Sequence, residues 1–216
     1  MFITFEGGEG AGKTTQIKRL ERHLSDQGRE VICLREPGGS RGAETIRNLV
    51  LNGAIDRWSA VEELFLFSAA RHELVRTKII PALDKGLVVL CDRYADSSAV
   101  YQGRAGGVPQ TALHVIENLA TQGLQPDLTF LIDIPVEIGL TRAHKRIADL
   151  KFKQNEGRFE GKTFKFHEDV RHAFLGRAAQ FPHRFRVING AQGIEEIGAD
   201  IWGEVQEFCM GQGGQP

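Results

Sequence analysis

Short apolar segments alternate with longer segments of helical periodicity along almost the entire chain. Four of the apolar segments are rich in Val, Ile, Leu or Phe and lack polar alternation, which is typical of strands buried on both faces. We predict strands at residues 2–6, 30–35, 87–91, 127–133 and 185–189. We predict helices at residues 13–27, 59–83, 108–122, 136–147, 163–180 and 194–208. The alternation predicts an α/β fold of three layers, in which a five-stranded parallel sheet has helices on both faces.

The chain has no internal repeat and no interdomain linker, so we expect a single domain over residues 1–210. Residues 148–162 differ from the rest because they are charged, punctuated by glycine and without a consistent period. Such a segment is either a linker-like loop or a short mobile lid over a binding site. We expect residues 211–216 to form a disordered tail.

The overall charge is close to neutral, with 27 Lys and Arg against 28 Asp and Glu and a net charge of −1. This balance gives no general attraction to nucleic acid or to an anionic membrane, so we expect neither as a partner. The N-terminus lacks a secretory signal, and no apolar run approaches the roughly 18 residues of a membrane span. Cys33, Cys91 and Cys209 are too few for a disulfide framework. We therefore expect the protein to be cytoplasmic.

The sequence Gly-Gly-Glu-Gly-Ala-Gly-Lys-Thr at residues 7–14 lies between the first predicted strand and the first predicted helix. It matches the pattern G-x-x-x-x-G-K-[ST] and predicts a phosphate-binding P-loop there. Glycines let the backbone wrap so that its amides point at phosphate oxygens, and the positive end of the following helix adds to the attraction. We expect Lys13 to reach the β- and γ-phosphates. The expected ATP-binding residues are Gly7, Gly8, Glu9, Gly10, Ala11, Gly12, Lys13, Thr14 and Thr15.

A magnesium ion accompanies ATP in sites of this kind, and the sequence offers two ligands for it. The hydroxyl of Thr14 is the first. The second is Asp92, which follows the apolar strand 87–91. The C-terminal ends of the strands form the ligand crevice of an open parallel sheet, so Asp92 is expected near Thr14. We expect Mg²⁺ to be the cofactor and these two residues to hold it.

P-loops serve several classes of protein, and further motifs narrow the choice. A guanine-reading Asn-Lys-x-Asp sequence is absent, which argues against a GTPase switch, and the small size argues against a motor or a transporter. Four motifs resemble those of bacterial thymidylate kinases, and their order and spacing cover residues 2–190. They are the segment 5–16 around the P-loop, Arg-Glu-Pro-Gly-Gly-Ser at 35–40, Phe-Ser-Ala-Ala-Arg at 67–71, and Asp-Arg-Tyr at 92–94 followed by Ser97, Ser98 and Tyr-Gln-Gly at 101–103.

The resemblance implies a P-loop kinase that transfers phosphate from ATP to dTMP. It places Arg93 and Arg35 at the acceptor phosphate, Phe67 on the thymine ring and Arg71 at the carbonyl edge of that ring. It places Glu9 near the deoxyribose 3′-hydroxyl and Tyr101 where a ribose 2′-hydroxyl would clash. The substrate-binding residues that it implies are Glu9, Arg35, Pro37, Phe67, Arg71, Arg93, Ser97, Ser98, Tyr101 and Gln102, and it implies Arg142 beside the adenine of ATP.

Several of these residues also have simpler interpretations. Phe67 and Arg71 are four residues apart on a predicted helix and share one face, from which they could stack on and hydrogen-bond to a base. Without the other motifs, they read as a core aromatic beside a surface arginine. Arg47 is either a phosphate contact or a solvated helix residue, and Arg142 is either an adenine contact or a plain helix arginine.

The resemblance also implies where a third catalytic charge comes from. Family members carry an arginine either in the P-loop, at the position of Gly10 here, or in the lid. The sequence Arg158-Phe159-Glu160 resembles the lid motif, although Gly157 stands where Asp is usual. Arg158 is the only arginine of the predicted lid, which also contains Lys151, Lys153 and Lys162. We therefore expect Lys13, Arg93 and Arg158 to be the catalytic residues.

Two other functions stay open, namely a kinase for another nucleoside monophosphate and a catalytically silent nucleotide-binding regulator. The Phe67, Arg71, Ser98, Tyr101 and Gln102 set argues against the first. Retention of Lys13, Thr14, Asp92, Arg93 and Arg158 argues against the second. By resemblance we expect a homodimer that pairs through helices. The helix 59–83 has more apolar residues than one sheet face needs, and burial of all of them within the monomer is the alternative: Val61, Leu64, Phe65, Leu66, Leu74, Val75 and Ile79.

Overall fold

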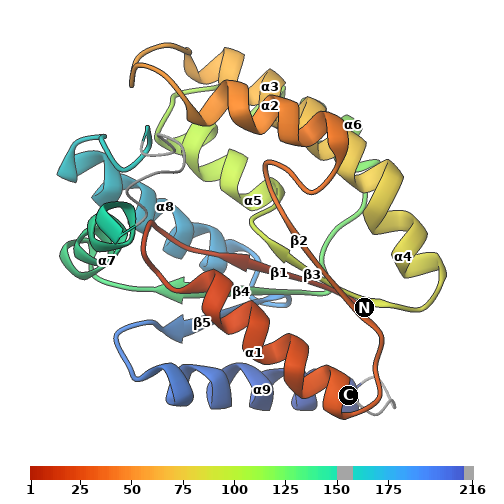
Figure 1. Ribbon diagram of the computed structural model, residues 1–216. Coiled ribbons are helices and arrows are strands. Elements are labelled where there is room, and N and C mark those ends of the chain that lie inside the picture. Colours follow the sequence, from red (N-terminus) through yellow and green to blue (C-terminus); the bar gives the residue numbers. More distant parts are fainter. Residues whose placement is uncertain (150–157, 212–216) are drawn as a thin grey trace.

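The computed structural model of the chain describes residues 1–149 and 158–211. Five strands form one sheet in the order β2-β3-β1-β4-β5, and every neighbouring pair is parallel. The strands are β1 Phe2–Glu6, β2 Val31–Arg35, β3 Val88–Asp92, β4 Leu128–Asp133 and β5 Phe185–Asn189. Figure 1 shows helices on both sides of this sheet. The predicted three-layer α/β fold is confirmed.

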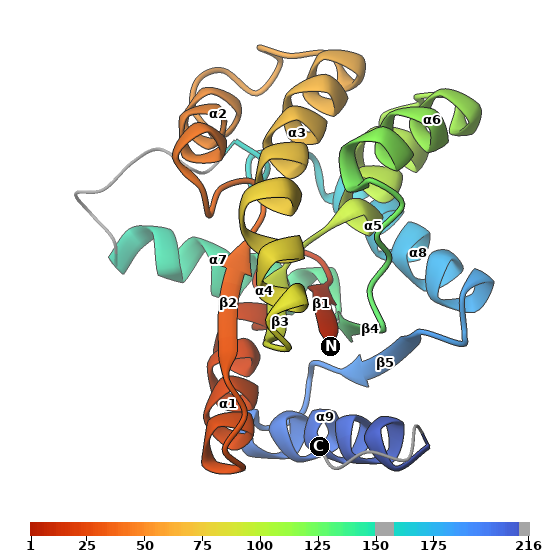
Figure 2. The ribbon, with the colours of Figure 1, turned by 90° about the vertical axis from the view of Figure 1, so that its right-hand side faces the viewer.

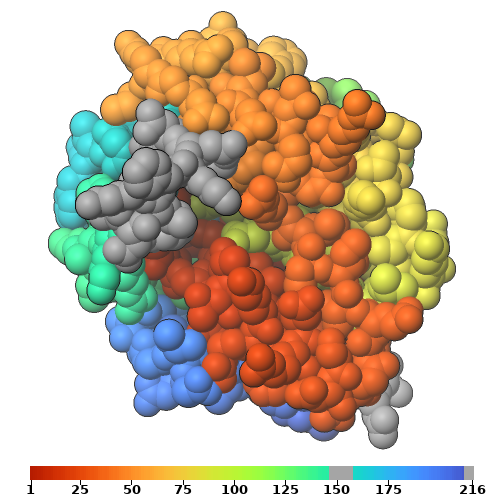
Figure 3. Space-filling view, viewed as in Figure 1, coloured from red at the N-terminus to blue at the C-terminus, as the bar shows by residue number. Residues whose placement is uncertain are grey.

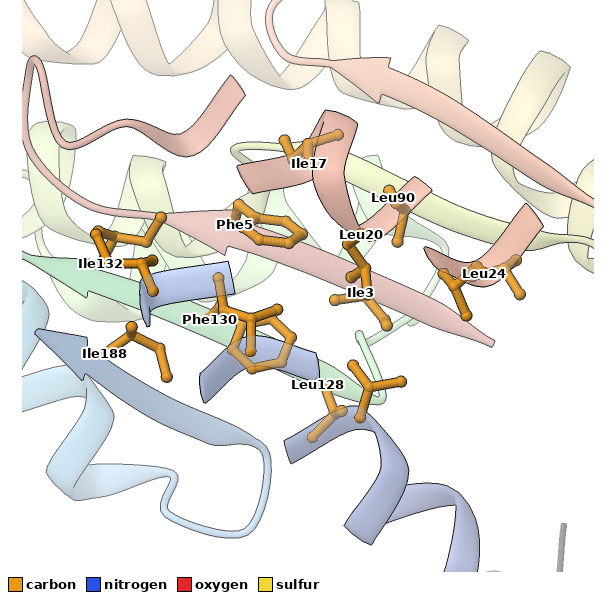
Figure 4. Packing of buried hydrophobic residues seen from close by; sticks show 14 of the residues in the cluster. Ile3, Phe5, Ile17, Leu20, Leu24, Leu90, Leu128, Phe130, Ile132 and Ile188 are labelled. Carbon is orange, nitrogen blue, oxygen red and sulfur yellow. The ribbon is translucent and has the colours of Figure 1, made fainter. Parts of the chain in front are cut away.

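The three central strands are buried on both faces, which explains their continuous apolar sequences. On one face, α1 (Lys13–Asp26) and α9 (Ile194–Gly211) cover the sheet. Their apolar side chains pack against β1 and β4 in the main core, where Ile3 and Phe130 are fully buried (Figure 4). Burial of a side chain of this size contributes about 1.5–3 kcal/mol, so this layer fixes the position of the loop that joins β1 to α1.

The other face carries two further apolar clusters. One joins β1 and β3 to the helical stretch at residues 74–82, and the second joins β4 and β5 to α8 (Phe164–Gln180). Beyond this layer, α2 (Arg41–Leu51), α3 (Ala60–Leu74) and α6 (Gln110–Thr121) stand side by side above the C-terminal ends of the strands (Figure 2). Residues of α2 and α3 line one cleft together with the β1–α1 loop.

The predicted helix 59–83 is divided in the structure. It consists of α3, a π-helical turn Val75–Ile79 (η1) and α4 (Ile80–Asp84), which follow one another without a break. Pro81 has no amide hydrogen for the carbonyl four residues earlier, which accounts for the altered winding before it. Helix α2 and the short helices α5 (Ala95–Ser98) and η2 (Ala99–Arg104) lie outside the predicted helical ranges.

The segment predicted as a lid is described only in part. Helix α7 (Val136–Asp149) extends two residues beyond its predicted end, and residues 158–162 form a turn before α8. Residues 150–157, with Lys151 and Lys153, lie outside the described residues, as do residues 212–216 of the predicted tail. No helix within the described ranges is long and apolar enough to cross a membrane.

Candidate active site

The β1–α1 loop has the form that the glycine pattern predicts. Gly12 precedes α1 with a φ of 94°, a left-handed conformation that favours glycine. The ammonium of Lys13 turns back over the loop and donates to the carbonyl oxygens of Gly7 (3.0 Å) and Gly8 (3.1 Å). Burial and the neighbouring Arg93 lower the pKa of Lys13 to about 8. The loop therefore holds a cation in place beside the N-terminus of a helix, where anions bind.

Gly10 is required by packing as well as by conformation. Its φ is +68°, and a Cβ at this position would lie 2.0 Å from the carbonyl oxygen of Gly139 in the first turn of α7. In the reverse direction, a Cβ on Gly139 would lie 2.5 Å from the carbonyl oxygen of Glu9. This contact leaves no room for an arginine in the P-loop at residue 10.

Thr14 and Asp92 meet at the edge of the sheet as predicted. The Thr14 hydroxyl donates to Asp92 Oδ2 at 2.7 Å, and both side chains border the same cleft. Among the described residues no group of three His, Cys, Asp or Glu gathers in a way that would hold a metal. A magnesium ion that accompanies a nucleotide needs only one or two protein oxygens, because water and phosphates complete its shell. The Thr14–Asp92 pair fits such an ion.

Arg93 follows Asp92 in an uncommon backbone conformation, with a φ of 68°. From there its guanidinium donates to Glu9 Oε1 (2.9 Å) and to Ser97 Oγ (3.1 Å). The Tyr101 hydroxyl donates to the same Glu9 oxygen at 2.9 Å. Burial opposes ionisation of Glu9, but Arg93, Lys13 and the Tyr101 hydroxyl together hold its pKa below the ordinary value. The contact joins the P-loop to the predicted acceptor residues through one carboxylate.

Glu6, at the end of β1, holds the segment after β3. Its carboxylate accepts from the backbone amides of Tyr94 (2.9 Å) and Ser97 (3.2 Å) and from the Ser97 hydroxyl (2.6 Å). Burial and the nearby Asp96 raise the pKa of Glu6 to about 7. Sequence analysis did not single out Glu6, because a carboxylate at the end of a buried strand gives no signal of the partners that it holds.

Arg71 lies at the centre of a buried polar cluster. Its guanidinium forms ion pairs with Glu36 (2.7 Å) and Glu117 and donates to Ser98 Oγ and to the Tyr94 carbonyl, both at 3.1 Å. The Arg71 side chain is 3% exposed, so the alternative of a surface arginine is excluded. Burial raises the pKa of Glu36 to about 7 even though Arg71 acts in the opposite direction. The partner Glu117 comes from α6. It lies 46 positions from Arg71 in the chain, so no local sequence pattern predicts the pair.

These residues border one cleft of about 1300 Å³ that is lined by the P-loop and by residues of α2 and α3. In Figure 3 red atoms of the N-terminal segment and orange atoms of the segment after it border a hollow on this face. Most ligand pockets measure about 300–1,000 Å³, so the cleft has room for two small ligands. Its lining includes Glu9, Gly10, Ala11, Gly12, Lys13, Thr14, Thr15, Arg35, Pro37, Phe67, Arg71, Asp92, Arg93, Ser97, Ser98, Tyr101, Gln102 and Arg142. Of the predicted site residues, only Gly7, Gly8 and Arg158 do not line it.

The peripheral arginines differ in how they are held. Arg35 pairs with Glu44 at 3.2 Å and is largely exposed. Arg47 lines the cleft and donates to the Pro37 carbonyl at 2.8 Å, so it supports the 35–40 loop whatever ligand binds. Arg142 is exposed and donates to the Gly190 carbonyl at 3.2 Å, on the P-loop side of the cleft.

Arg158 lies away from the P-loop. Its side chain is 0% exposed and pairs with Glu63 of α3 at 2.7 Å. The guanidinium also donates to the carbonyls of Val50, Ala54 and Trp58, in the segment from the end of α2 to the start of α3. Each guanidinium nitrogen of Arg158 thus has a partner that does not line the cleft, and the catalytic role of Arg158 stays a prediction.

Comparison with known proteins gives one consistent result. The family model described as thymidylate kinase matches residues 5–201. The curated thymidylate kinases of Caulobacter vibrioides and Bartonella quintana are each 46% identical to this chain over 200 residues, which span 93% of the chain and 93% and 92% of the respective relatives. The crystal structure of thymidylate kinase from Ehrlichia chaffeensis superposes with a TM-score of 0.76 at 30% identity and covers 95% of this chain and 98% of that one.

Proposed function

Because the chain belongs to the thymidylate kinase family and phosphorylates dTMP, we propose that its cleft binds ATP and dTMP at the same time. One observation supports this proposal: the P-loop, Phe67 and Arg71 line the same cleft, and Arg93, which also lines it, pairs with Glu9 of the P-loop. In this arrangement the acceptor phosphate of dTMP approaches the γ-phosphorus of ATP near Arg93.

The donor half of the proposal uses the β1–α1 loop. The backbone amides of residues 7–15 and the N-terminus of α1 bind the phosphates, while Lys13 exchanges the Gly7 and Gly8 carbonyls for phosphate oxygens. Thr14 and Asp92 would hold Mg²⁺, which when bound neutralises charge on the ATP phosphates. Arg142, which lines the cleft, would lie beside the adenine.

The acceptor half uses the segments after β2 and β3. Arg93 and Arg35 bind the phosphate of dTMP, to which forked guanidinium donors are well suited. Phe67 stacks on the thymine ring, and Arg71 donates to a carbonyl of the ring from within its cluster of carboxylates. Tyr101 and Glu9 lie beside the deoxyribose. The 2.9 Å contact between them supports this assignment, because a 2′-hydroxyl would have to displace it. Pro37, Ser97, Ser98 and Gln102 complete the acceptor site.

Transfer of the phosphoryl group proceeds by positioning and by stabilisation of charge. Lys13 and Arg93 are the catalytic residues whose positions support this role. The lid would exclude water when it closes and would contribute a further cation. We assign that task to Arg158, which would have to leave Glu63 and the three carbonyls that it contacts in order to perform it.

We also propose a homodimer. Leu64, Leu74, Val75 and Ile79 are fully buried in the monomer and are not available for pairing. The exposed apolar residues of the neighbouring helices α2, α3 and α6 instead supply the surface: Leu49, Val61, Phe65, Val115 and Leu119. Neighbouring exposed apolar residues of this kind are typical of protein interfaces. We place this single kinase domain, residues 1–210, in the cytoplasm, where its nucleotide substrates are found.

The experiment that tests the proposed function is product analysis. Purified protein with ATP, dTMP and Mg²⁺ should form dTDP and ADP in equal amounts, and removal of Mg²⁺ with a chelator should stop the reaction. Release of ADP without dTDP would contradict the proposal.

A further inference from the structure

Glu63 is a buried carboxylate that lies behind the cleft. It belongs to the first turn of α3, is 6% exposed and does not border the cleft itself. Its two oxygens have different partners. Oε1 pairs with Arg158 Nη2 at 2.7 Å, and Oε2 accepts from Gln102 Nε2 at 2.9 Å. Glu63 therefore connects Arg158, in the described part of the predicted lid, to a residue that lines the acceptor part of the cleft.

Arg158 is the charge partner of Glu63. Arg158 donates to carbonyls at 3.1–3.4 Å, one of them that of Val50 in the last turn of α2. A cation is favourable at the C-terminal end of a helix, and Glu63 balances its charge. Removal of one partner from a buried pair leaves an uncompensated charge, which is strongly destabilising. The pair therefore holds the Glu63 carboxylate in a fixed position.

The Glu63 carboxylate decides which way the Gln102 amide is turned. A carboxylate accepts hydrogen bonds and donates none, so the amide nitrogen of Gln102 must face it. The amide oxygen is then the atom that Gln102 can offer to a ligand. Gln102 is 1% exposed but borders the cleft, and no hydrogen bond to its Oε1 is found among the described residues.

The orientation of this amide has a consequence for the choice of base. Thymine and uracil carry N–H at ring position 3, which is a hydrogen-bond donor, whereas cytosine carries an acceptor nitrogen there. An amide oxygen accepts from the first and repels the second. We propose that Glu63 is a positioning residue for acceptor specificity, which holds Gln102 with its oxygen toward the base and so favours a pyrimidine with N3–H. This inference rests on the proposed binding of dTMP in the acceptor part of the cleft.

Glu63→Gln tests the proposal with almost no change of shape. The single oxygen of the substituted side chain should pair with the charged Arg158, so that the new amide nitrogen faces Gln102. The Gln102 amide then turns over and presents a donor to the cleft. We expect the ratio of kcat/KM for dTMP to that for dCMP to fall at least about tenfold, because an unmatched hydrogen-bonding group in a binding site is costly. The change should appear mainly in KM for dTMP and not in kcat.

A ratio of two substrates on one enzyme does not depend on the fraction of protein that is folded, so lost stability cannot imitate this result. Glu62→Gln is the matched control. Glu62 is exposed, and glutamine can replace it in the capping box with Ser59, so this variant should keep the wild-type ratio.

Gln102→Ala completes a double-mutant cycle. In that background Glu63→Gln should not change the dTMP to dCMP ratio further. The inference is overturned if Glu63→Gln leaves the ratio unchanged, or if its effect persists without Gln102. Failure of the proposed function would look different, because the wild-type enzyme itself would then not prefer dTMP to dCMP.

Discussion

The hydroxyl of Thr14 donates to the carboxylate of Asp92 across 2.7 Å and joins two residues that are 78 positions apart in the chain. The parallel pairing of β1 with β3 makes this possible, because it brings the C-terminal ends of both strands to one edge of the sheet. The contact orients Asp92 toward the P-loop, where the charge of the ATP phosphates must be balanced.

Asp92→Asn should lower kcat at least about 100-fold, because it removes a charge from the site of transfer and leaves the side-chain shape unchanged. The measurement is kcat over a range of Mg²⁺ concentrations, and the concentration needed for half-maximal rate should rise. Asp84→Asn, at the exposed end of α4, is the matched control. Near-normal kcat for Asp92→Asn at ordinary Mg²⁺ concentrations would refute the role that we assign to Asp92.

The affinity for ATP should fall as the pH rises through about 8. Burial and Arg93 lower the pKa of Lys13 to about 8 from its ordinary value of 10.5. Below that pH the side chain carries the charge that attracts phosphates, and above it the free enzyme holds neutral Lys13. Titration of ATP affinity between about pH 7 and 9.5 measures this effect, and Lys13→Met should bind weakly with no such step. An affinity for ATP that is flat across this range in the wild-type enzyme would argue against our description of Lys13.

An arginine at Gly10 should abolish ATP binding and not add a catalytic charge. A side chain there would lie 2.0 Å from the Gly139 carbonyl and would have to adopt a φ of +68°. The loop must therefore move, and calorimetry should detect no binding of ATP to Gly10→Arg. Gly176→Ala on α8 adds a Cβ that meets no heavy atom within 4 Å beyond the backbone of its own helix, and it should keep normal affinity. Tight ATP binding by Gly10→Arg would show that the contact with α7 is less rigid than we infer.

Arg158→Ala should reduce the free energy of unfolding by about 3–5 kcal/mol and raise KM for dTMP, because Glu63 is left buried without its partner. Denaturant unfolding and steady-state kinetics measure the two effects. A catalytic Arg158, as expected from the resemblance, would instead give a loss of kcat by roughly 10²–10⁴ with unchanged binding of dTMP. That pattern, in a variant of normal stability, would favour a catalytic role for Arg158 over a structural role as the partner of Glu63.

Phe65→Glu should convert a dimer into a monomer of 23.9 kDa. Phe65 is 58% exposed on α3 beside other apolar residues, so the substitution adds charge to the proposed interface without disturbing the core. Sedimentation at micromolar concentration distinguishes the two states. A wild-type protein that is already monomeric there would exclude the proposed dimer.

The sequence allowed the sheet, its parallel strands and most of the cleft to be predicted, because these follow from short-range patterns. A strand, a glycine-rich loop and a helix are contiguous at residues 2–26, and Asp92 directly ends an apolar run. The short helices around residues 95–104 were missed because one or two turns are too short to show a period. Glu36, Glu63 and Glu117 were not assigned because their roles depend on partners distant in the chain.

The most direct test of the account is a comparison of acceptors under one set of conditions. Steady-state kcat/KM should be measured for dTMP, dUMP, UMP, CMP and AMP with saturating ATP and Mg²⁺. We predict that dTMP is the best acceptor and that dUMP is slower by the small factor that one methyl group allows, about 1–3 kcal/mol. UMP should be poor because its 2′-hydroxyl meets the Tyr101–Glu9 contact. Comparable values for dTMP and AMP would contradict the proposed acceptor site.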